Sequence, residues 1–383
     1  MTTKQVQLSK LSKFTNGKFL PTKERQTIGQ FDVYGSNGII AKTERCLYEK
    51  PVIVIGRVGA NCGTIQRAKT ASWITDNCIV SIPKDDTDFD FLFYVLKFLK
   101  LNRLAIGSAQ PLLTQDILNS IGITSMTLLQ QQKIGKTLSD LDTKIDNLQN
   151  QNRTLEQMAQ AIFKSWFVDF DGVTEFEDSE LGKIPKGWSV DKLENVCSKI
   201  TDGSHFSPKE ETNGVKMIGT VKNMNEHDFD FDSCKKISDE DYHKLVKNGC
   251  KAELGDILLS KDGTMGLSIL YQNTVNLVLL SSIAIIKTNE NFSNYYLKIL
   301  LSQKNNLSVL IAGHSSGSAL PRIVLKDLKT FQLLIPNNLK LKKFDNIIQH
   351  MYTEIFRNSQ KIENLTKTRD ALLPKLMSGE IRV

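Results

Sequence analysis

The spacing of apolar residues changes along the chain, and the second half repeats the changes of the first. Short apolar runs bounded by turn residues, at 51–56 and 256–260, are typical of buried strands. Large apolar residues at helical spacing then follow, at 89–104 and at 294–310, and predict one helix in each half. Each half is therefore expected to contain a mixed α/β domain, closed by a last strand near residue 122 or 333.

A different pattern begins at residue 130 and again at residue 337, with apolar residues at alternating spacings of three and four. Five consecutive heptads of this kind predict a coiled coil. No proline interrupts 130–168, so the first helix spans roughly 58 Å at 1.5 Å per residue. Because the first helix leads into the second domain and the second helix leaves it, the two are expected to pack antiparallel.

Short motifs confirm that the chain is duplicated. The segment Ser12-Lys13-Phe14-Thr15-Asn16-Gly17 returns as 198–203, and Gly107-Ser108-Ala109-Gln110-Pro111 returns as 317–321. A period near 200 residues indicates a repeated domain rather than a solenoid. The expected fold is mixed α/β, with two homologous domains separated by a pair of long antiparallel coiled-coil helices in a pseudo-two-fold arrangement. The expected segments are a first domain, first helix, acidic linker, second domain and second helix at 1–129, 130–168, 169–186, 187–336 and 337–383.

Polar residues interrupt both heptad series. Asn152 in the first helix and Arg369 in the second occupy apolar positions of the pattern. Such residues commonly fix the register of a coiled coil at some loss of stability. The alternative is that each lies at a frayed or exposed turn, and the sequence leaves both interpretations open.

Composition narrows the possible functions. The chain has 383 residues, a formal net charge of +7 and six cysteines without a Cys-x-x-Cys pair. Residues 1–129 carry 16 basic and 10 acidic side chains, whereas 187–336 carry 17 of each. A positive first domain is compatible with a polyanionic partner. Neither a zinc site nor a disulfide framework is expected, and no segment is apolar enough to cross a membrane, so a cytoplasmic protein is predicted.

Motifs of catalysis are missing from the sequence. The glycines of 56–63 do not follow the dinucleotide pattern, and Gly135-Lys136-Thr137 lacks the first glycine of a P-loop and falls within the coil. An adenine methyltransferase needs an Asp/Asn-Pro-Pro-aromatic loop, and no two prolines are adjacent. Acidic pairs such as Asp85-Asp86 are typical of hydrated loops, and no Ser/His/Asp arrangement has a supporting context. No enzymatic activity, metal or cofactor is therefore expected in this chain.

The repeated loops are better candidates for binding. Arg57 and Lys261 occupy matching positions one residue beyond the buried strand of each copy. Glycines in Gly-Ser-Ala-x-Pro allow a close backbone approach, while polar side chains beside them are suited to base edges and phosphates. The alternative is that Gly-Ser-Ala-x-Pro only forms a structural turn. The candidate DNA contacts are Ser36, Asn37, Arg57, Asn61, Asn77, Ser108, Gln110, Lys216, Lys222, Lys261, His314, Ser316, Ser318 and Arg322.

In combination, these features resemble the specificity subunit of type I restriction-modification systems. The resemblance rests on the duplicated domains that each end in a long helix, the turn Val33-Tyr34-Gly35-Ser36-Asn37-Gly38-Ile39, the Ile-Gly-Arg-x-Gly strand end, the Gly-Ser-x-x-Pro loops and the segment Leu181-Gly182-Lys183-Ile184-Pro185-Lys186-Gly187-Trp188. It covers essentially the entire chain.

The resemblance implies that two target-recognition domains each recognise one half of a bipartite, asymmetric site on double-stranded DNA. It also implies that the coils set the spacer and that two methyltransferase (M) subunits dock on them, with restriction (R) subunits in the same prokaryotic complex. S-adenosylmethionine, ATP and Mg would then belong to those partner subunits. The alternative function is a coiled-coil adaptor that binds protein only, and the balanced charge of 187–336 argues against strong DNA affinity of that domain alone.

Overall fold

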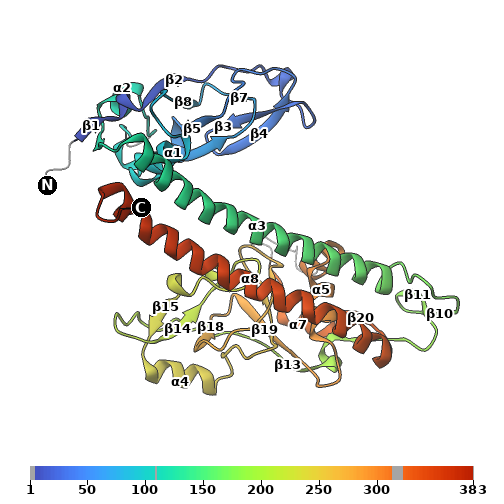
Figure 1. Cartoon of the computed structure of the whole chain (residues 1–383). Coiled ribbons are helices and arrows are strands. Elements are labelled where there is room, and N and C mark those ends of the chain that lie inside the picture. Colours follow the sequence, from blue (N-terminus) through green and yellow to red (C-terminus); the bar gives the residue numbers. More distant parts are fainter. Residues whose placement is uncertain (1–4, 108–109, 313–321, 383) are drawn as a thin grey trace. The chain divides into compact units, whose positions relative to one another are not determined.

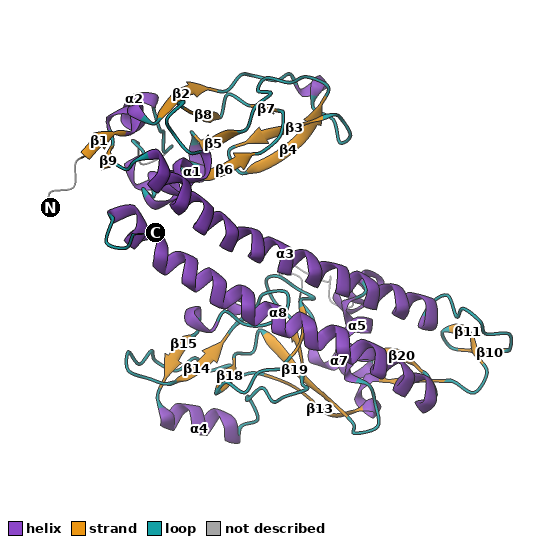
Figure 2. Ribbon diagram, viewed as in Figure 1, coloured by secondary structure: helices purple, strands orange, loops and turns teal. Residues whose placement is uncertain are grey.

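The structure is a computed structural model that describes residues 5–107, 110–312 and 322–382 (Figure 1). The chain forms two compact units. Unit 1 comprises Met1–Asp146 and Glu363–Val383, and unit 2 comprises Asn147–Ile362. Both units contain sheets, short helices and part of each of two long helices, as Figure 2 shows.

Unit 1 is built on a four-stranded antiparallel sheet and a three-stranded mixed sheet. The first has the order β2-β8-β5-β6, with β2 (Ser12–Asn16), β8 (Cys78–Pro83), β5 (Val52–Gly56) and β6 (Ile65–Ala68). The second has the order β4-β3-β7, with β4 (Gly38–Thr43), β3 (Phe31–Gly35) and β7 (Ser72–Ile74). Strand β1 (Gln5–Gln7) pairs with β9 (Gly122–Thr124), and the helices are α1 (Phe89–Phe98) and α2 (Gln115–Ser120).

Helix α1 is shorter than the apolar spacing predicted. Asp88 caps its first turn by accepting a hydrogen bond from the Phe91 backbone N–H at 2.8 Å. At the other end Lys100 adopts a left-handed backbone conformation with φ of 47°, which stops the α-helix. The residues up to Leu104 continue only as a 3-10 turn. The predicted helix at 89–104 is therefore correct in position and too long by about one and a half turns.

Unit 2 repeats this topology. Its four-stranded sheet has the order β13-β19-β16-β17, with β13 (Cys197–Asp202), β19 (Ile283–Thr288), β16 (Ile257–Ser260) and β17 (Ser268–Leu270). Its three-stranded sheet has the order β15-β14-β18, with β15 (Lys235–Ile237), β14 (Lys216–Gly219) and β18 (Leu277–Leu279). Strand β12 (Ser189–Lys192) pairs with β20 (Gln332–Ile335) as β1 pairs with β9. The prediction of a duplicated mixed α/β fold is confirmed.

The short helices of unit 2 are α4 (Asp239–Lys247), α5 (Asn294–Ser302), α6 (Lys304–Ala312) and α7 (Leu325–Thr330). The single helix predicted at 294–310 is wrong, because Gln303 is extended and separates α5 from α6. The side chain of Asn306 donates a hydrogen bond of 2.8 Å to the Leu300 carbonyl, which satisfies an acceptor at the end of α5.

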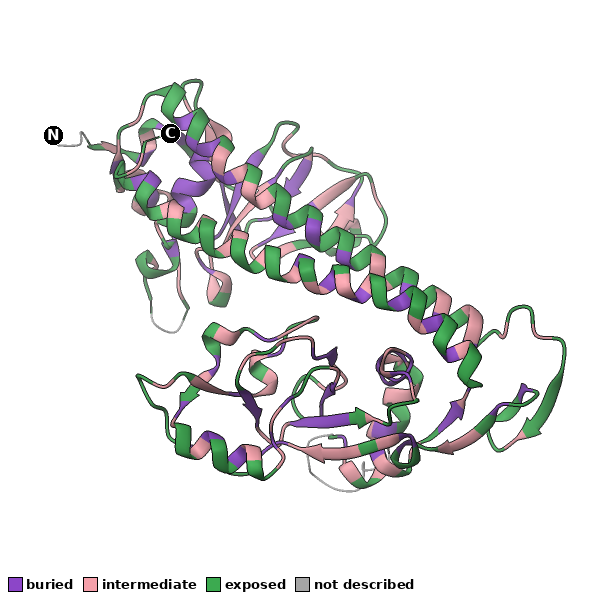
Figure 3. Ribbon diagram, turned by 60° about the horizontal axis from the view of Figure 1, so that its bottom comes forward, coloured by how far each residue is buried: buried purple, intermediate pink, exposed green. Residues whose placement is uncertain are grey.

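Two long helices supply much of the core. Helix α3 (Leu128–Phe167) and helix α8 (Asn338–Ser378) are drawn green and red in Figure 1. In unit 1, Ile134 and Leu138 share a buried cluster with Leu376 and Met377. In Figure 3, buried and exposed residues alternate along these helices, as an amphipathic pattern requires.

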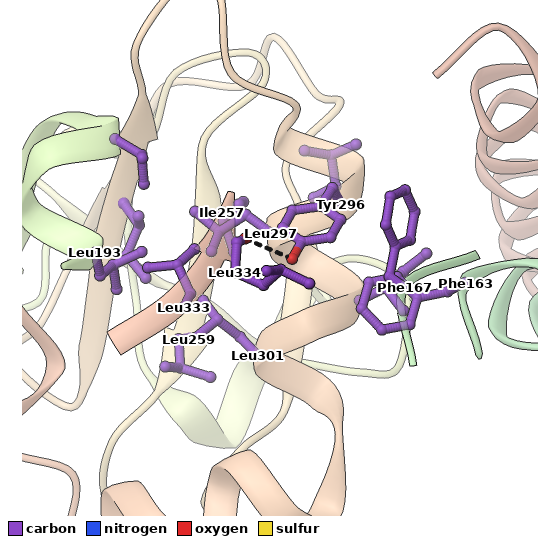
Figure 4. Packing of buried hydrophobic residues seen from close by; sticks show 14 of the residues in the cluster. Phe163, Phe167, Leu193, Ile257, Leu259, Tyr296, Leu297, Leu301, Leu333 and Leu334 are labelled. Carbon is purple, nitrogen blue, oxygen red and sulfur yellow. Dashed lines mark hydrogen bonds between the residues drawn. The ribbon is translucent and has the colours of Figure 1, made fainter. Parts of the chain in front are cut away.

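In unit 2 the other ends of these helices pack together on the domain core. The Phe163 and Phe344 rings lie 6.2 Å apart, and Phe167 lies 4.8 Å from Tyr296 of α5 (Figure 4). The Tyr296 hydroxyl donates to the Leu334 carbonyl at 2.8 Å. In unit 1, Ile134 clusters with Leu376 and Asp142 pairs with Arg369. In unit 2, Asn152 contacts Asn358 and Phe163 lies against Phe344. Residue numbers therefore fall along α8 as they rise along α3, and the predicted antiparallel pairing is confirmed.

The segment predicted as an acidic linker contains a β-hairpin. Strands β10 (Phe176–Ser179) and β11 (Gly182–Pro185) pair antiparallel within it. Phe170 packs at 5.8 Å from the Trp188 ring, and Ile184 is buried. These apolar contacts order a stretch whose many charges alone suggested a solvated connection.

Candidate nucleic-acid interface

Arg57 stands at the end of β5, where three other loops of unit 1 meet. Its backbone N–H donates to the Asn77 carbonyl at 2.9 Å, and its carbonyl accepts from the Leu113 N–H at 2.9 Å. Its guanidinium Nη1 donates to the Asp76 carbonyl at 3.4 Å, and the residue is only half-buried. The backbone of Arg57 is thus fixed while a planar group with five donors stays near solvent.

Neighbouring loops are tied to the same place by hydrogen bonds. Thr64 and Gln66 both donate from their side chains to the Ser36 carbonyl, the latter at 3.2 Å. The Gly59 N–H donates to the Pro111 carbonyl at 3.0 Å. We call the turn 36–37, the loop 57–64, the turn 75–77 and residues 110–113 the unit 1 loop cluster.

This cluster brings together most of the predicted contacts of the first copy. Asn37, Asn77 and Gln110 are exposed, while Ser36 and Asn61 are half-buried. Amide, hydroxyl and guanidinium groups on fixed loops form a surface able to donate to and accept from base edges. The predicted contact Ser108 lies outside the described residues.

Unit 2 has the same backbone arrangement around Lys261. The Lys261 N–H donates to the Ser282 carbonyl at 2.8 Å, and its carbonyl accepts from the Ile323 N–H at 3.0 Å. These are the counterparts of the bonds that Arg57 makes to Asn77 and Leu113. The matching positions inferred from the sequence are therefore equivalent in the fold.

The two basic side chains differ in environment. Lys261 Nζ lies 2.6 Å from the Asp202 carboxylate, and only 9% of its side chain is exposed. A buried lysine needs such a partner because removing its charge from water is costly. The environment of Lys261 therefore favours a structural role, whereas Arg57 is accessible, and contact of either residue with DNA stays a prediction.

The remaining candidates of unit 2 divide into two places. Lys222 is exposed in the 3-10 turn Val221–Asn223 that follows β14, and the preceding Val221 N–H donates to the Ser282 hydroxyl at 3.4 Å. Arg322 is exposed next to Ile323. We call residues 220–222, 261–266, 280–282 and 322–323 the unit 2 loop cluster. Lys216 lies at the opposite end of β14, with Nζ 5.0 Å from the Tyr242 ring, and does not belong to it.

Three further predicted contacts, His314, Ser316 and Ser318, lie outside the described residues. Sequence reasoning also missed Asp202, whose carboxylate neutralises Lys261 and lies 3.6 Å from His205 Nε2. A signal was available, since Asp202 replaces Asn16 of the first copy just as Lys261 replaces Arg57. Both positions of the pair therefore change between the two copies, as positions in contact often do.

The glycine that ends the repeated motif Ser-Lys-x-Thr-Asn/Asp-Gly has a steric role. A Cβ on Gly17 would lie 2.1 Å from the Thr75 carbonyl oxygen, and one on Gly203 would lie 2.2 Å from that of Leu279. In unit 1 the chain after β2 therefore runs directly against the turn at Thr75, which also holds Arg57. In unit 2 the chain after β13 likewise runs against the residues from Leu279 on, which hold Lys261. The repeated motif builds the same edge of the loop cluster twice.

The predicted register residues of the coil lie in different surroundings. Asn152 is 1% exposed, which excludes an exposed turn, and it contacts Asn358 of α8. Arg369 is partly exposed and donates from Nη1 to Asp142 of α3 at 2.7 Å. Both polar residues thus have partners on the opposing helix within their own unit.

Asp142 joins α3 to the body of unit 1. It accepts hydrogen bonds from the Tyr94 hydroxyl and from Arg369, and lies 3.5 Å from Arg67 Nη2. Burial alone would raise its pKa, but the hydrogen bonds from Tyr94 and Arg369 and nearby cations hold the pKa of Asp142 below its ordinary value. Arg67 also lies 3.7 Å from the Phe93 ring centroid. The helix pair and the sheet domain are therefore connected by one charged network.

All six cysteines are free thiols. In the parts of the chain that the structure describes, no cluster of three His, Cys, Asp or Glu side chains could hold a metal ion. No helix among the same residues is long and apolar enough to cross a membrane.

Comparisons with known proteins agree with this architecture. A family model described as type I restriction modification DNA specificity domain matches residues 2–157 and 185–369. The chain is similar to the type I restriction enzyme MjaIX specificity subunit of Methanocaldococcus jannaschii, with 30% identity over 322 residues that cover 79% of this chain and 71% of the relative. The MjaVIII specificity subunit of the same organism is 27% identical over 349 residues, covering 85% and 78%.

Among solved structures, a type I restriction-modification system S subunit from M. genitalium matches with a TM-score of 0.66. The match covers 98% of this chain and 96% of that chain at 16% sequence identity. At this identity the likeness concerns the fold alone.

Proposed function

The chain belongs to the family of type I restriction-modification specificity subunits, and from this premise we propose that it recognises a bipartite, asymmetric DNA site, one half through each unit. The family assignment confirms the resemblance found in the sequence. Recognition of DNA is the role of this family, and the two-part site is the finer statement that the proposal adds.

The observation that carries the proposal is the difference between two equivalent loop positions. Arg57 and Lys261 have the same backbone partners, yet one guanidinium is near solvent and the other cation is buried against Asp202. A duplicated frame with unlike side chains at equivalent places is suited to two different half-sites. An identical pair would instead favour a palindrome.

Partner subunits complete the proposed complex. The paired helices α3 and α8 are proposed to set the spacer and to dock two methyltransferase subunits, with restriction subunits in the same assembly. S-adenosylmethionine, ATP and Mg are proposed to bind those partners, and this chain is proposed to be non-catalytic and to work in the prokaryotic cytoplasm. Its own contribution is the placing of hydrogen-bonding loops on DNA.

Sequencing of methylated adenines in the host, with and without this gene, tests the proposal. We expect one two-part motif to lose methylation on deletion and to regain it on complementation. A palindromic or uninterrupted motif would contradict the two-reader proposal. A protein-only adaptor is distinguished by substitutions in the two loop clusters, which would then leave the DNA binding of the assembled complex unchanged.

A further inference from the structure

Each unit exposes one phenylalanine on the segment that follows the first strand of its larger sheet. Phe19 comes three residues after β2 and is 64% exposed, and Phe206 comes four residues after β13 and is 58% exposed. Single exposed apolar residues are ordinary at protein surfaces. What distinguishes this pair is that both lie on the corresponding segment of a duplicated fold, one position apart when Gly17 is aligned with Gly203.

Both segments run against the turn that holds the basic residue of the loop cluster. The Lys18 N–H donates to the Ile74 carbonyl at 2.9 Å, next to the turn 75–77. The Ser204 N–H donates to the Leu279 carbonyl at 2.7 Å, and its carbonyl accepts from the Ser281 N–H. Each phenylalanine is therefore carried at the edge of its unit's loop cluster.

The backbone beside each ring is fixed, although by different means. In unit 1 the Trp73 indole N–H donates to the Lys18 carbonyl at 2.9 Å. On the other side of Phe19, Leu20 is fully buried. In unit 2 the Ser204 hydroxyl donates to the Phe206 carbonyl at 2.7 Å and accepts from the Phe206 N–H at 3.0 Å. A rigid, exposed aromatic group loses little conformational entropy when it binds.

A lysine accompanies each phenylalanine, with Lys18 preceding Phe19 and Lys244 near the Phe206 ring. Lys18 is exposed beside Phe19, and His205, which is 81% exposed, precedes Phe206. Lys244 Nζ lies 5.9 Å from the Phe206 ring centroid. An apolar ring among basic and hydrogen-bonding groups is suited to a nucleic acid, where bases offer flat apolar faces between phosphates.

We propose that Phe19 and Phe206 are apolar base contacts, one for each half-site, that insert at a base step and hold the duplex on the loop clusters. The inference rests on the proposed DNA recognition and deepens it. Inserted phenylalanines partly unstack the bases that they enter. The contact thus adds sequence preference without a hydrogen bond, since some base steps unstack more easily than others.

The test uses the complete chain assembled with its methyltransferase subunits and a duplex that carries the site found by methylome sequencing. 2-Aminopurine is placed at one position at a time, outside the adenines that are methylated, because methyltransferases flip their target base. We expect wild-type protein to raise the fluorescence at one step in each half-site. Phe19→Ala should abolish the rise in one half only, and Phe206→Ala in the other.

Affinity gives a second readout. Each alanine variant should bind the cognate duplex about tenfold more weakly or worse, the size expected for loss of one base-aromatic contact. Phe19→Met and Phe206→Met keep an apolar side chain and should recover most of that loss. Phe176→Ala is the matched control, because Phe176 is 43% exposed on the hairpin β10–β11, outside both loop clusters.

The proposal is overturned if wild-type complex binds the site tightly without a fluorescence rise at any probed step. It is also overturned if the alanine variants bind as tightly as the Phe176→Ala control, or lose affinity equally for cognate and random duplex. Failure of the proposed function gives a different result. The wild-type complex itself would then bind the cognate duplex no more tightly than random DNA.

Discussion

Asn358 of α8 donates a hydrogen bond from Nδ2 to Oδ1 of Asn152 of α3 at 3.0 Å, and both side chains are buried. Asn152 in turn donates to the Ile355 carbonyl and to the Ser359 hydroxyl, each at 3.3 Å. Amide groups in an apolar seam are stable only while they keep such partners, so this pair favours one alignment of the two helices.

Replacing one member of the pair should therefore destabilise the protein. Asn358→Leu leaves the Asn152 carbonyl oxygen buried without that donor, and we expect a loss of about 1–3 kcal/mol in the free energy of unfolding. Urea unfolding followed by circular dichroism measures the loss. The exposed Asn147 of α3 is the control, and Asn147→Leu should leave the unfolding midpoint nearly unchanged. Equal effects of the two substitutions would show that the buried pair has no special role.

Acid should weaken the connection between α3 and unit 1. The folded pKa of Asp142 lies below its ordinary value of 3.8. Its ion pairing therefore contributes stability above about pH 4, and this contribution is lost as the pH falls through the lowered folded pKa. At pH 7, Asp142→Asn should cost about 1.5–3 kcal/mol.

Thermal unfolding of wild-type protein and Asp142→Asn between pH 6 and pH 3 checks this sign. The difference in unfolding temperature between wild-type protein and the variant should shrink as the pH falls toward 3, because a protonated aspartic acid resembles asparagine. A difference that stays constant over this range would contradict the assigned role of the Asp142 charge.

Arg57→Ala should weaken binding of the assembled complex to its cognate site by about 1–3 kcal/mol and relax discrimination in one half-site only. The reason is that the guanidinium lies near solvent on a fixed loop and is able to contact a base edge. Competition binding measures the discrimination, with competitor duplexes in which the bases of one half-site at a time are changed. Lys183→Ala, on the exposed hairpin, is the control. If affinity falls equally for random DNA, Arg57 contacts phosphate instead.

Lys261 should behave differently from Arg57. Lys261→Ala leaves the Asp202 carboxylate without its close cation, so we expect loss of stability in unit 2, by about 3–5 kcal/mol for a broken buried pair. The double variant Asp202→Asn/Lys261→Met removes both charges and should regain most of it. Urea unfolding of the three proteins decides the matter, and a Lys261→Ala protein as stable as wild type would show that the pair is not structural.

Periodicity in the sequence predicted the fold well and its details less well. The heptads located both long helices, because an apolar stripe sustained over many turns has no other common explanation. Periodicity could not locate the break at Gln303 or the end of α1 before Lys100, because these depend on single backbone conformations. The hairpin β10–β11 was hidden because charge dominates its composition while a few aromatic contacts order it.

For the candidate interface, repeat alignment found the equivalent positions of Arg57 and Lys261 but not their environments. Burial of Lys261 depends on Asp202, which lies 59 positions away in the chain and is adjacent only in the folded sheet. The hydrogen bonds that join Arg57 to Asn77 and Leu113 likewise link segments far apart in the chain, and the sequence pattern does not contain them. The chemical type of each side chain was thus predictable from the sequence, whereas its partners in the folded chain were not.

If each unit recognises its own half of the site, exchanging one domain should change only that half. Residues 189–335, from β12 to β20, are replaced by the corresponding segment of the MjaIX relative while α3 and α8 are kept. Circular dichroism and co-purification with the methyltransferase subunits verify that the exchanged protein folds and assembles. Methylome sequencing of a host that carries it should show one half of the original motif unchanged and the other half replaced. A motif altered in both halves, or in neither, would contradict the account.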